Sequence, residues 1–173
     1  LINAGSYIFN DDVFDWMPQG KHSIERDVFP KLAAEGLLSG VPFDGYFIDA
    51  GTPNAWNQAV KTSIVHGRYM NGHVAGTPPS WFADEGARSS VAAGSKLDHC
   101  MVAQGCSIGA SSVSMSTLLS GAKIGDEATV SSCLIGQKAT VGHGCQLNGV
   151  IVDHGVNVPD GTVQEGGSWP PLA

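Results

Sequence analysis

The sequence has little positive charge. Its 173 residues include 9 Lys and Arg against 16 Asp and Glu, which gives a formal net charge of −7. A nucleic-acid partner requires Lys and Arg gathered on one face to neutralise phosphates, and no basic run occurs in this chain. We therefore expect no nucleic-acid partner.

Long apolar runs are also missing. No stretch approaches the roughly 18 apolar residues that a transmembrane helix needs, and no cationic leader with an apolar core opens the sequence. We expect no membrane partner and a cytoplasmic location. The chain begins at Leu1 in what reads as a strand already in progress, so we also expect it to be part of a longer protein.

The few cysteines lack the spacing of a metal site or a disulfide framework. Cys100, Cys106, Cys133 and Cys145 show no C-x-x-C pair and no paired spacing with the six His. Because disulfides are rare in a reducing compartment, we expect reduced thiols.

Helix punctuation is present in the amino-terminal part of the chain. Ser23 is a candidate helix cap, and Pro30 and Gly36 stand where a short helix would open and close. Thr52 precedes a second predicted helix over residues 53–65. With predicted strands nearby, this part of the chain reads as α/β.

The stretch DGYFIDAGTP, residues 44–53, places a carboxylate between a predicted strand and a predicted helix. Residues 46–48 and 4–9 both predict buried strands. From the residues alone, Asp49 either closes a strand-to-helix turn or contributes to a ligand site at the end of the strand.

The carboxyl-terminal half repeats itself. Aliphatic residues recur at steps of five or six, except for an irregular stretch over residues 114–119, and small residues such as Cys106, Ser112 and Ala128 follow four positions after many of them. The aliphatic positions are Val91, Leu97, Val102, Ile108, Ile124, Val130, Ile135, Val141, Leu147, Val152 and Val158. Because side chains alternate along a strand, the large and small residues of each step face one interior.

Three short strands make one coil of about 17 residues, as from Ile135 to Val152, with Gly-containing turns between them. An amphipathic helix is excluded because it would not tolerate so many glycines. This pattern resembles the hexapeptide-repeat, left-handed parallel β-helix. We expect a mainly β fold, with four to five coils whose cores take up the four cysteines.

These patterns divide the chain into segments. We assign residues 1–70 to a partial α/β domain, residues 71–85 to a connection, residues 86–163 to the β-helix and residues 164–173 to a tail.

Three motifs in the first 67 residues carry a second resemblance. NAGSYIF (3–9), SIERDVFPKLAAEG (23–36) and FDGYFIDAGTPNAW (43–56) together resemble the carboxyl-terminal part of the sugar-nucleotide pyrophosphorylases, most closely their mannose-1-phosphate guanylyltransferase members. This resemblance implies a nucleotidyltransferase that joins an NTP to a sugar 1-phosphate and releases pyrophosphate. Many of these enzymes carry a β-helix after the catalytic domain.

The resemblance also implies roles for two residues. Asp49, in IDAGT, corresponds to an acid that helps to hold Mg²⁺, and Asn3, in NAG, corresponds to a sugar-binding residue. Ser23, Glu25 and Arg26 are assigned to structure. The family's Gly-x-Gly-Thr-Arg loop, first metal-binding Asp and Glu-Lys-Pro motif do not occur in this chain, so we expect no complete catalytic set, no activity of the chain alone, and a homo-oligomer.

Two alternatives use the β-helix itself. Hexapeptide proteins include acyltransferases with a histidine base, for which His99, His143 and His154 are candidates. The other alternative is a non-catalytic assembly or effector-sensing module.

Overall fold

The computed structural model describes residues 3–68, 71–83 and 90–171. The chain forms two compact units, Leu1–Phe47 and Ile48–Ala173, which are described separately below. Within the described residues, no helix is both long and apolar enough to cross a bilayer.

The first unit is a small helical assembly. It contains a 3₁₀-helix η1 (Asp11–Trp16), a π-helical turn η2 (Ile24–Val28) and the helix α1 (Phe29–Ala34), which are packed around Val13, Val28 and Leu32. The predicted cap is confirmed, because Ser23 Oγ accepts from the Arg26 N–H at 3.3 Å. The Ser23 N–H donates in return to Asp27 Oδ2 at 2.7 Å, so the two side chains satisfy free amides at the start of η2.

The strands predicted at residues 4–9 and 46–48 do not form. Residues 3–68 contain no strand, and Tyr46 and Phe47 are 58% and 43% exposed. A strand requires a hydrogen-bonded neighbour to satisfy its backbone, and no such neighbour lies beside these segments within the first unit. Their apolar sequence is therefore not sufficient to make a sheet.

The second unit begins with the helix α2 (Pro53–Val65), which has the predicted bounds. Thr52 Oγ1 accepts from the Ala55 N–H at 3.3 Å, and Gly67 follows the helix with φ of 64°. The cap, the proline in the first turn and the left-handed glycine explain both ends locally.

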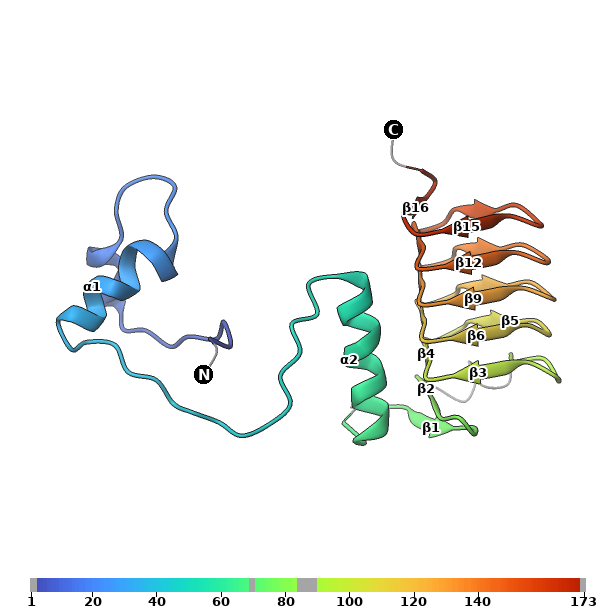
Figure 1. Ribbon diagram of the computed structural model, residues 1–173, viewed down its shortest axis with the longest axis horizontal. Coiled ribbons are helices and arrows are strands. Elements are labelled where there is room, and N and C mark those ends of the chain that lie inside the picture. Colours follow the sequence, from blue (N-terminus) through green and yellow to red (C-terminus); the bar gives the residue numbers. More distant parts are fainter. Residues whose placement is uncertain (1–2, 69–70, 84–89, 172–173) are drawn as a thin grey trace. The chain divides into compact units, whose positions relative to one another are not determined.

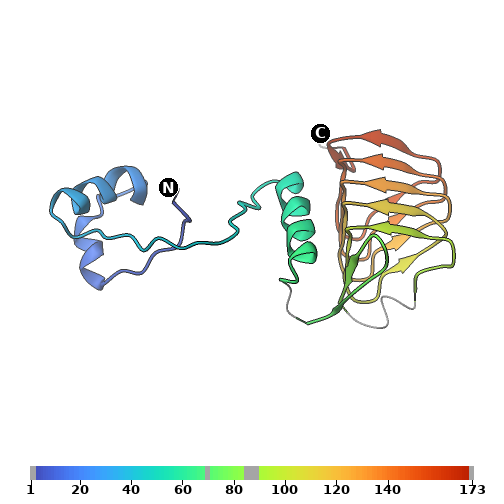
Figure 2. The same cartoon turned by 60° about the horizontal axis from the view of Figure 1, so that its bottom comes forward.

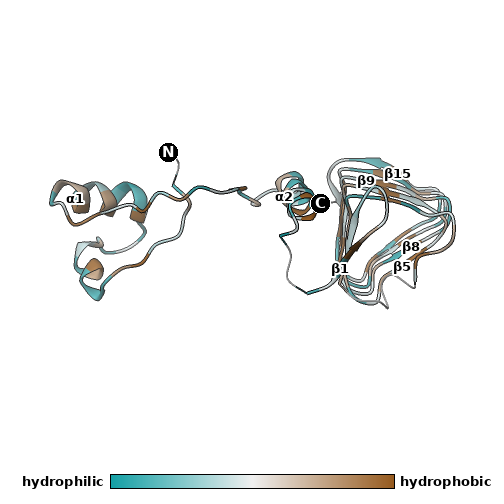
Figure 3. Cartoon of the chain, turned by 90° about the horizontal axis from the view of Figure 1, so that it is seen from below, coloured by the Kyte–Doolittle hydropathy of each residue, from teal (hydrophilic) through white to brown (hydrophobic). Residues whose placement is uncertain are grey.

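Three parallel sheets form a coil of triangular cross-section beside α2, as Figures 1 and 3 show. Sheet A, with seven strands, contains β1 (His73–Ala75), β2 (Ser80–Phe82), β4 (Met101–Val102), β7 (Thr117–Leu118), β10 (Leu134–Ile135), β13 (Ile151–Val152) and β16 (Ser168–Trp169). Strand β1 is antiparallel to β2, and the other pairs among these described strands are parallel. Sheet B contains β5 (Ser107–Ile108), β8 (Lys123–Ile124), β11 (Thr140–Val141) and β14 (Asn157–Val158). Sheet C contains β3 (Lys96–Asp98), β6 (Ser112–Ser114), β9 (Thr129–Ser131), β12 (Gln146–Asn148) and β15 (Val163–Glu165).

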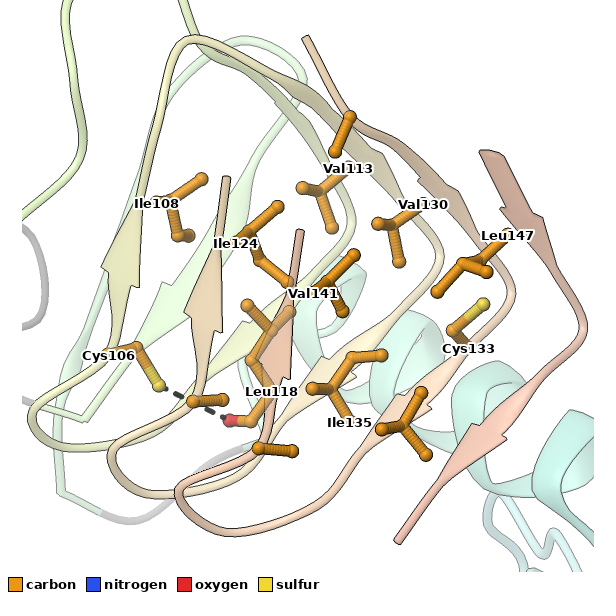
Figure 4. Packing of buried hydrophobic residues seen from close by; sticks show 14 of the residues in the cluster. Cys106, Ile108, Val113, Leu118, Ile124, Val130, Cys133, Ile135, Val141 and Leu147 are labelled. Carbon is orange, nitrogen blue, oxygen red and sulfur yellow. Dashed lines mark hydrogen bonds between the residues drawn. The ribbon is translucent and has the colours of Figure 1, made fainter. Parts of the chain in front are cut away.

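Nine of the eleven predicted aliphatic positions are buried in the interior of this β-helix (Figure 4), and the other two, Val91 and Leu97, are partly buried and pack against it. The stretch that looks irregular in the sequence fits as well, because Val113 and Leu118 are completely buried between Ile108 and Ile124. One inward position was wrong. Ser112 is exposed and Ser111 is 6% exposed, because the step from Ile108 to Val113 is one residue shorter than the preceding step of six and shifts the small residue by one.

The boundaries of the compact units differ from the predicted segments. Strands β1 and β2, from the predicted connection, belong to sheet A, and β16 extends the same sheet into the predicted tail. Helix α2, which we placed with residues 1–70, belongs to the same compact unit as the β-helix. The reason is a set of contacts between α2 and sheet A that are distant in sequence.

All four cysteines are buried and unoxidised, as expected. Their thiols lie against backbone carbonyls; Cys106 Sγ, for example, is 3.8 Å from the Leu118 oxygen (Figure 4). Burial disfavours the charged thiolate and raises the pKa of Cys100 to about 11.

Candidate functional site

Asp49 lies in a tight turn immediately before α2. Its Oδ1 accepts a hydrogen bond from the Gly51 N–H at 3.0 Å, and a Cβ added at Gly51 would come within 3.1 Å of the same oxygen. The carboxylate is exposed, and the free N–H groups and dipole of the α2 amino terminus favour negative charge nearby. The turn therefore presents a preorganised carboxylate to solvent.

The geometry fits one ligand of a hard cation. Mg²⁺ prefers carboxylate oxygens and keeps several waters, so a single exposed Asp is a suitable protein ligand when other ligands complete the shell. Among residues 3–68, 71–83 and 90–171, no group of three or more His, Cys, Asp and Glu side chains could hold a metal ion. Asp49 thus provides at most part of a metal site within the described chain.

Asn3 belongs to a polar cluster in the first unit. Its Nδ2 donates to Tyr7 Oη at 2.7 Å and to Glu25 Oε1 at 3.1 Å, while its Oδ1 accepts from the Gly5 N–H at 2.9 Å. The Tyr7 hydroxyl also donates to Glu25 Oε1, and this hydrogen bond to the carboxylate raises the pKa of Tyr7. The cluster places an amide, a phenol and a carboxylate at an exposed surface, and both Asn3 Nδ2 protons are already donated within it.

The structure thus places the two predicted site residues in different compact units. Asn3 lies in the first unit and Asp49 in the second. Sequence reasoning assigned Glu25 only to structure and missed its contact with Asn3. Glu25 lies in the motif over residues 23–36, but nothing in the sequence spacing indicated that its side chain contacts residue 3.

Helix α2 lies along the outer face of sheet A, as Figures 1 and 2 both show. Trp56 Nε1 donates to Thr117 Oγ1 at 3.0 Å, and the Thr117 hydroxyl donates to Asn57 Oδ1 at 3.0 Å. Asn57 Nδ2 donates to the Cys133 carbonyl at 3.3 Å. These hydrogen bonds tie the helix that follows the Asp49 turn to two consecutive coils of the β-helix.

A groove of about 280 Å³ lies between α2 and sheet A. Its lining is mainly apolar and combines helix residues with outward-facing strand residues: Ala50, Trp56, Ala59, Val60, Ser63, Ile64, Arg68, Trp81 and Met101. The outer face of sheet A is thus unlike a solvated sheet face, because Trp81, Met101 and Thr117 successively face the helix.

The candidate histidines of the acyltransferase alternative lie at corners of the coil. His99 has φ of 51° and its Nδ1 contacts the Asp98 carboxylate. His143 Nε2 is 3.7 Å from Glu127 Oε2, and His154 Nδ1 accepts from the Gln137 N–H at 2.8 Å. Each ring thus contacts a neighbouring residue of the β-helix.

A parallel coil with three short strands per turn, a narrow aliphatic core and left-handed residues at its corners defines the class of hexapeptide-repeat β-helix proteins. Residues 78–164 match the family described as GlmU-like, C-terminal hexapeptide, and the chain belongs to this family.

The chain is also similar to mannose-1-phosphate guanylyltransferases. It is 47% identical over 55 residues to the enzyme of Mycobacterium tuberculosis, a match that covers 30% of this chain and 15% of the relative. It is 40% identical over 52 residues to the catalytic subunit beta from Dictyostelium discoideum and 44% identical over 52 residues to the guanyltransferase of Yarrowia lipolytica, each covering 30% of this chain and 14% of the relative. The chain therefore spans about 15% of the length of the curated relatives it matches.

The resemblance to this enzyme class is thus confirmed, and the protein is a hexapeptide β-helix module related to mannose-1-phosphate guanylyltransferases.

Proposed function

We propose that this chain is the carboxyl-terminal part of a sugar-1-phosphate nucleotidyltransferase of the GDP-mannose type. The observation that carries the proposal is the Asp49 turn, whose exposed carboxylate is locked by the Gly51 N–H at the start of a helix fastened to the β-helix. The similarity to three mannose-1-phosphate guanylyltransferases supports the choice of reaction.

In the proposed reaction, a phosphate oxygen of the sugar 1-phosphate attacks the α-phosphorus of the NTP. The bond from that phosphorus to the β-phosphate bridging oxygen breaks, and pyrophosphate leaves. When bound, Mg²⁺ supplies charge neutralisation at the phosphate oxygens. Asp49 would provide one oxygen ligand for it, and Asn3 Oδ1, which accepts one hydrogen bond from the Gly5 N–H, would accept a second from a sugar hydroxyl.

The residues of this chain supply positioning rather than the whole catalytic set. In-line transfer requires the nucleotide, the metal and the sugar phosphate to be held together. A Gly-x-Gly-Thr-Arg nucleotide loop does not occur among the 173 residues. We therefore propose that the nucleotide is bound by residues of the full-length protein outside this chain.

The test is the Asp49→Asn variant of the full-length protein, assayed for magnesium-dependent pyrophosphate release with GTP and mannose 1-phosphate. Loss of a metal ligand should lower kcat by about tenfold or more without changing the melting temperature. The matched control is Asp44→Asn, in the same exposed segment, which should retain full turnover. Wild-type turnover in Asp49→Asn would leave the residue with a turn-forming role alone.

The choice of nucleotide and sugar is tested in the same assay. GTP with mannose 1-phosphate should give the highest kcat/KM among pairs of NTP and hexose 1-phosphate. A clear preference for another pair would retain the reaction class and overturn the GDP-mannose assignment.

A further inference from the structure

The contact between α2 and sheet A has a polar centre. Asn57 is 2% exposed and Thr117 is 1% exposed, so both side chains are removed from water. The surrounding groove is lined mainly by apolar side chains such as Val60, Ile64 and Met101. A buried amide in such a setting must be hydrogen-bonded, because an unpaired one costs free energy that no water recovers.

The hydrogen bonds form a continuous chain. The Trp56 indole donates to the Thr117 hydroxyl, which donates to the Asn57 carbonyl oxygen, while the Asn57 amide donates to the Cys133 carbonyl. The Cys133 carbonyl also accepts the Thr117 N–H at 3.0 Å, so one sheet carbonyl serves both the strand and the helix. Every link has one donor and one acceptor in the correct order.

This series of hydrogen bonds can form at only one position of the helix along the sheet. Apolar side chains pack at several offsets with similar free energy, whereas a hydrogen-bonded pair is satisfied at one offset and leaves buried groups unpaired at all others. The neighbouring outward positions of sheet A are Met101 on one side and Leu134 on the other, and neither replaces the Thr117 hydroxyl. The pair therefore selects one register.

The register of α2 also determines the position of the Asp49 turn. Thr52 caps the helix through the Ala55 N–H, and the Gly51 N–H holds the Asp49 carboxylate one turn earlier. These local contacts fix the position of Asp49 relative to Asn57. A shift of α2 along the sheet would move the carboxylate with it.

We propose that Asn57 and Thr117 are positioning residues that fix the register of α2 on the β-helix and, through it, the place of the Asp49 carboxylate. The claim that the pair places the Asp49 carboxylate for a metal rests on the proposed function. The claim that the pair fixes the register of α2 does not. The β-helix then acts as a rigid support for the metal-binding carboxylate of Asp49, which lies in the turn before α2.

The first experiment measures amide hydrogen exchange of the 173-residue chain by mass spectrometry. Thr117→Val leaves the buried Asn57 oxygen without a donor and the Trp56 indole without its acceptor, so exchange in peptides covering residues 48–65 should accelerate by about tenfold. Exchange in the strands of sheets B and C should not change. The matched control is Thr140→Val in β11, the same substitution at a partly buried β-helix position, which should leave α2 exchange as in the wild type.

The double variant Asn57→Leu/Thr117→Val separates register from packing. It removes both partners of the buried Thr117–Asn57 hydrogen bond. The Trp56 indole also loses its Thr117 acceptor, but Trp56 is 39% exposed and its N–H has access to water, so α2 exchange should return to within about threefold of the wild type. Unchanged α2 exchange in Thr117→Val would overturn the proposal, and so would equal acceleration in Thr140→Val.

The second experiment measures magnesium dependence of pyrophosphate release in the full-length protein. The double variant should need several-fold more Mg²⁺ for half-maximal activity, with KM for the sugar phosphate nearly unchanged, because its helix is packed but its register is no longer specified. A wild-type magnesium requirement in the double variant would overturn the positioning of Asp49. If the wild-type full-length protein releases no pyrophosphate, the proposed function fails, and the exchange experiment alone decides the register.

Discussion

The Ser116 hydroxyl accepts a hydrogen bond from the Cys133 N–H at 3.0 Å across one coil of the β-helix. It donates in turn to the Ser114 carbonyl at 2.7 Å, and the side chain is 1% exposed. The pattern recurs nearer the amino-terminal end, where Ser80 Oγ accepts from the Cys100 N–H at 3.1 Å. Buried serines thus satisfy backbone amides at the corner that leads into sheet A.

Ser116→Ala should destabilise the β-helix. The substitution leaves the Cys133 N–H without its partner in a site that water does not reach, so the free energy of unfolding should fall by about 1–3 kcal/mol. Urea denaturation measures the change. Ser112→Ala, on the exposed outer face of sheet C, is the matched control and should stay within about 0.5 kcal/mol of the wild type. Equal losses at both positions would contradict the role assigned to Ser116.

Ile135→Asp should disrupt the coil. Ile135 is completely buried, and an Asp there places an unpaired charge in the aliphatic core, so the loss should reach about 4 kcal/mol or more. Thermal melting followed by circular dichroism measures it. Ile151→Asp is the control, because Ile151 lies in the next coil of sheet A but is 39% exposed. If Ile135→Asp melts at the same temperature as the wild type, position 135 is not buried away from water, and the prediction is wrong.

The β-helix should lose stability in alkaline solution. Burial raises the pKa of Cys100 from 9.0 to about 11, and it also raises the pKa of Cys133. The unfolded chain therefore releases these protons first, so stability is complete below pH 9 and falls as the pH approaches 11. Cys100 contributes a slope of up to about 1.4 kcal/mol per pH unit in this window, and the raised pKa of Cys133 acts in the same direction.

Denaturation midpoints measured between pH 8 and 11 test this linkage. Cys100→Ala should reduce the slope above pH 9, whatever its effect on absolute stability, because one of the shifted thiols is gone. Identical slopes in the variant and the wild type would contradict the assignment to Cys100.

The isolated chain should self-associate. Large apolar side chains of the first unit are exposed, among them Ile8 at 101%, Val41 at 89% and Phe43 at 62%. Apolar surface of this kind is normally covered by another protein surface, and a second copy of the chain is the partner present in a purified sample. Light scattering at micromolar concentration should report a dimer or a trimer.

The double variant Val41→Ser/Phe43→Ser should shift this equilibrium toward the monomer, because it reduces the exposed apolar surface. A wild-type chain that stays monomeric across the concentration range would refute the expected homo-oligomer.

Elements with local signals were predictable from the sequence. Helix α2 occupies its predicted range because the Thr52 cap, Pro53 and Gly67 act within one turn of each end. The β-helix was equally predictable from the sequence, because inward residues such as Ile135 and Val152 recur at the spacing of one coil. The strand predicted at residues 46–48 failed because its stability would depend on a neighbour rather than on its own residues.

The sequence by itself therefore determined the repeated interior, the ends of α2 and the burial of the cysteines, since each depends on spacing along one stretch of chain. Only the tertiary structure decided that Asn57 is buried against Thr117, sixty residues away, and that Glu25 meets Asn3. An Asn in a helix and a Thr in a strand are ordinary surface residues by composition. Their burial depends on which face of α2 meets which face of sheet A, and that choice is made by packing between elements.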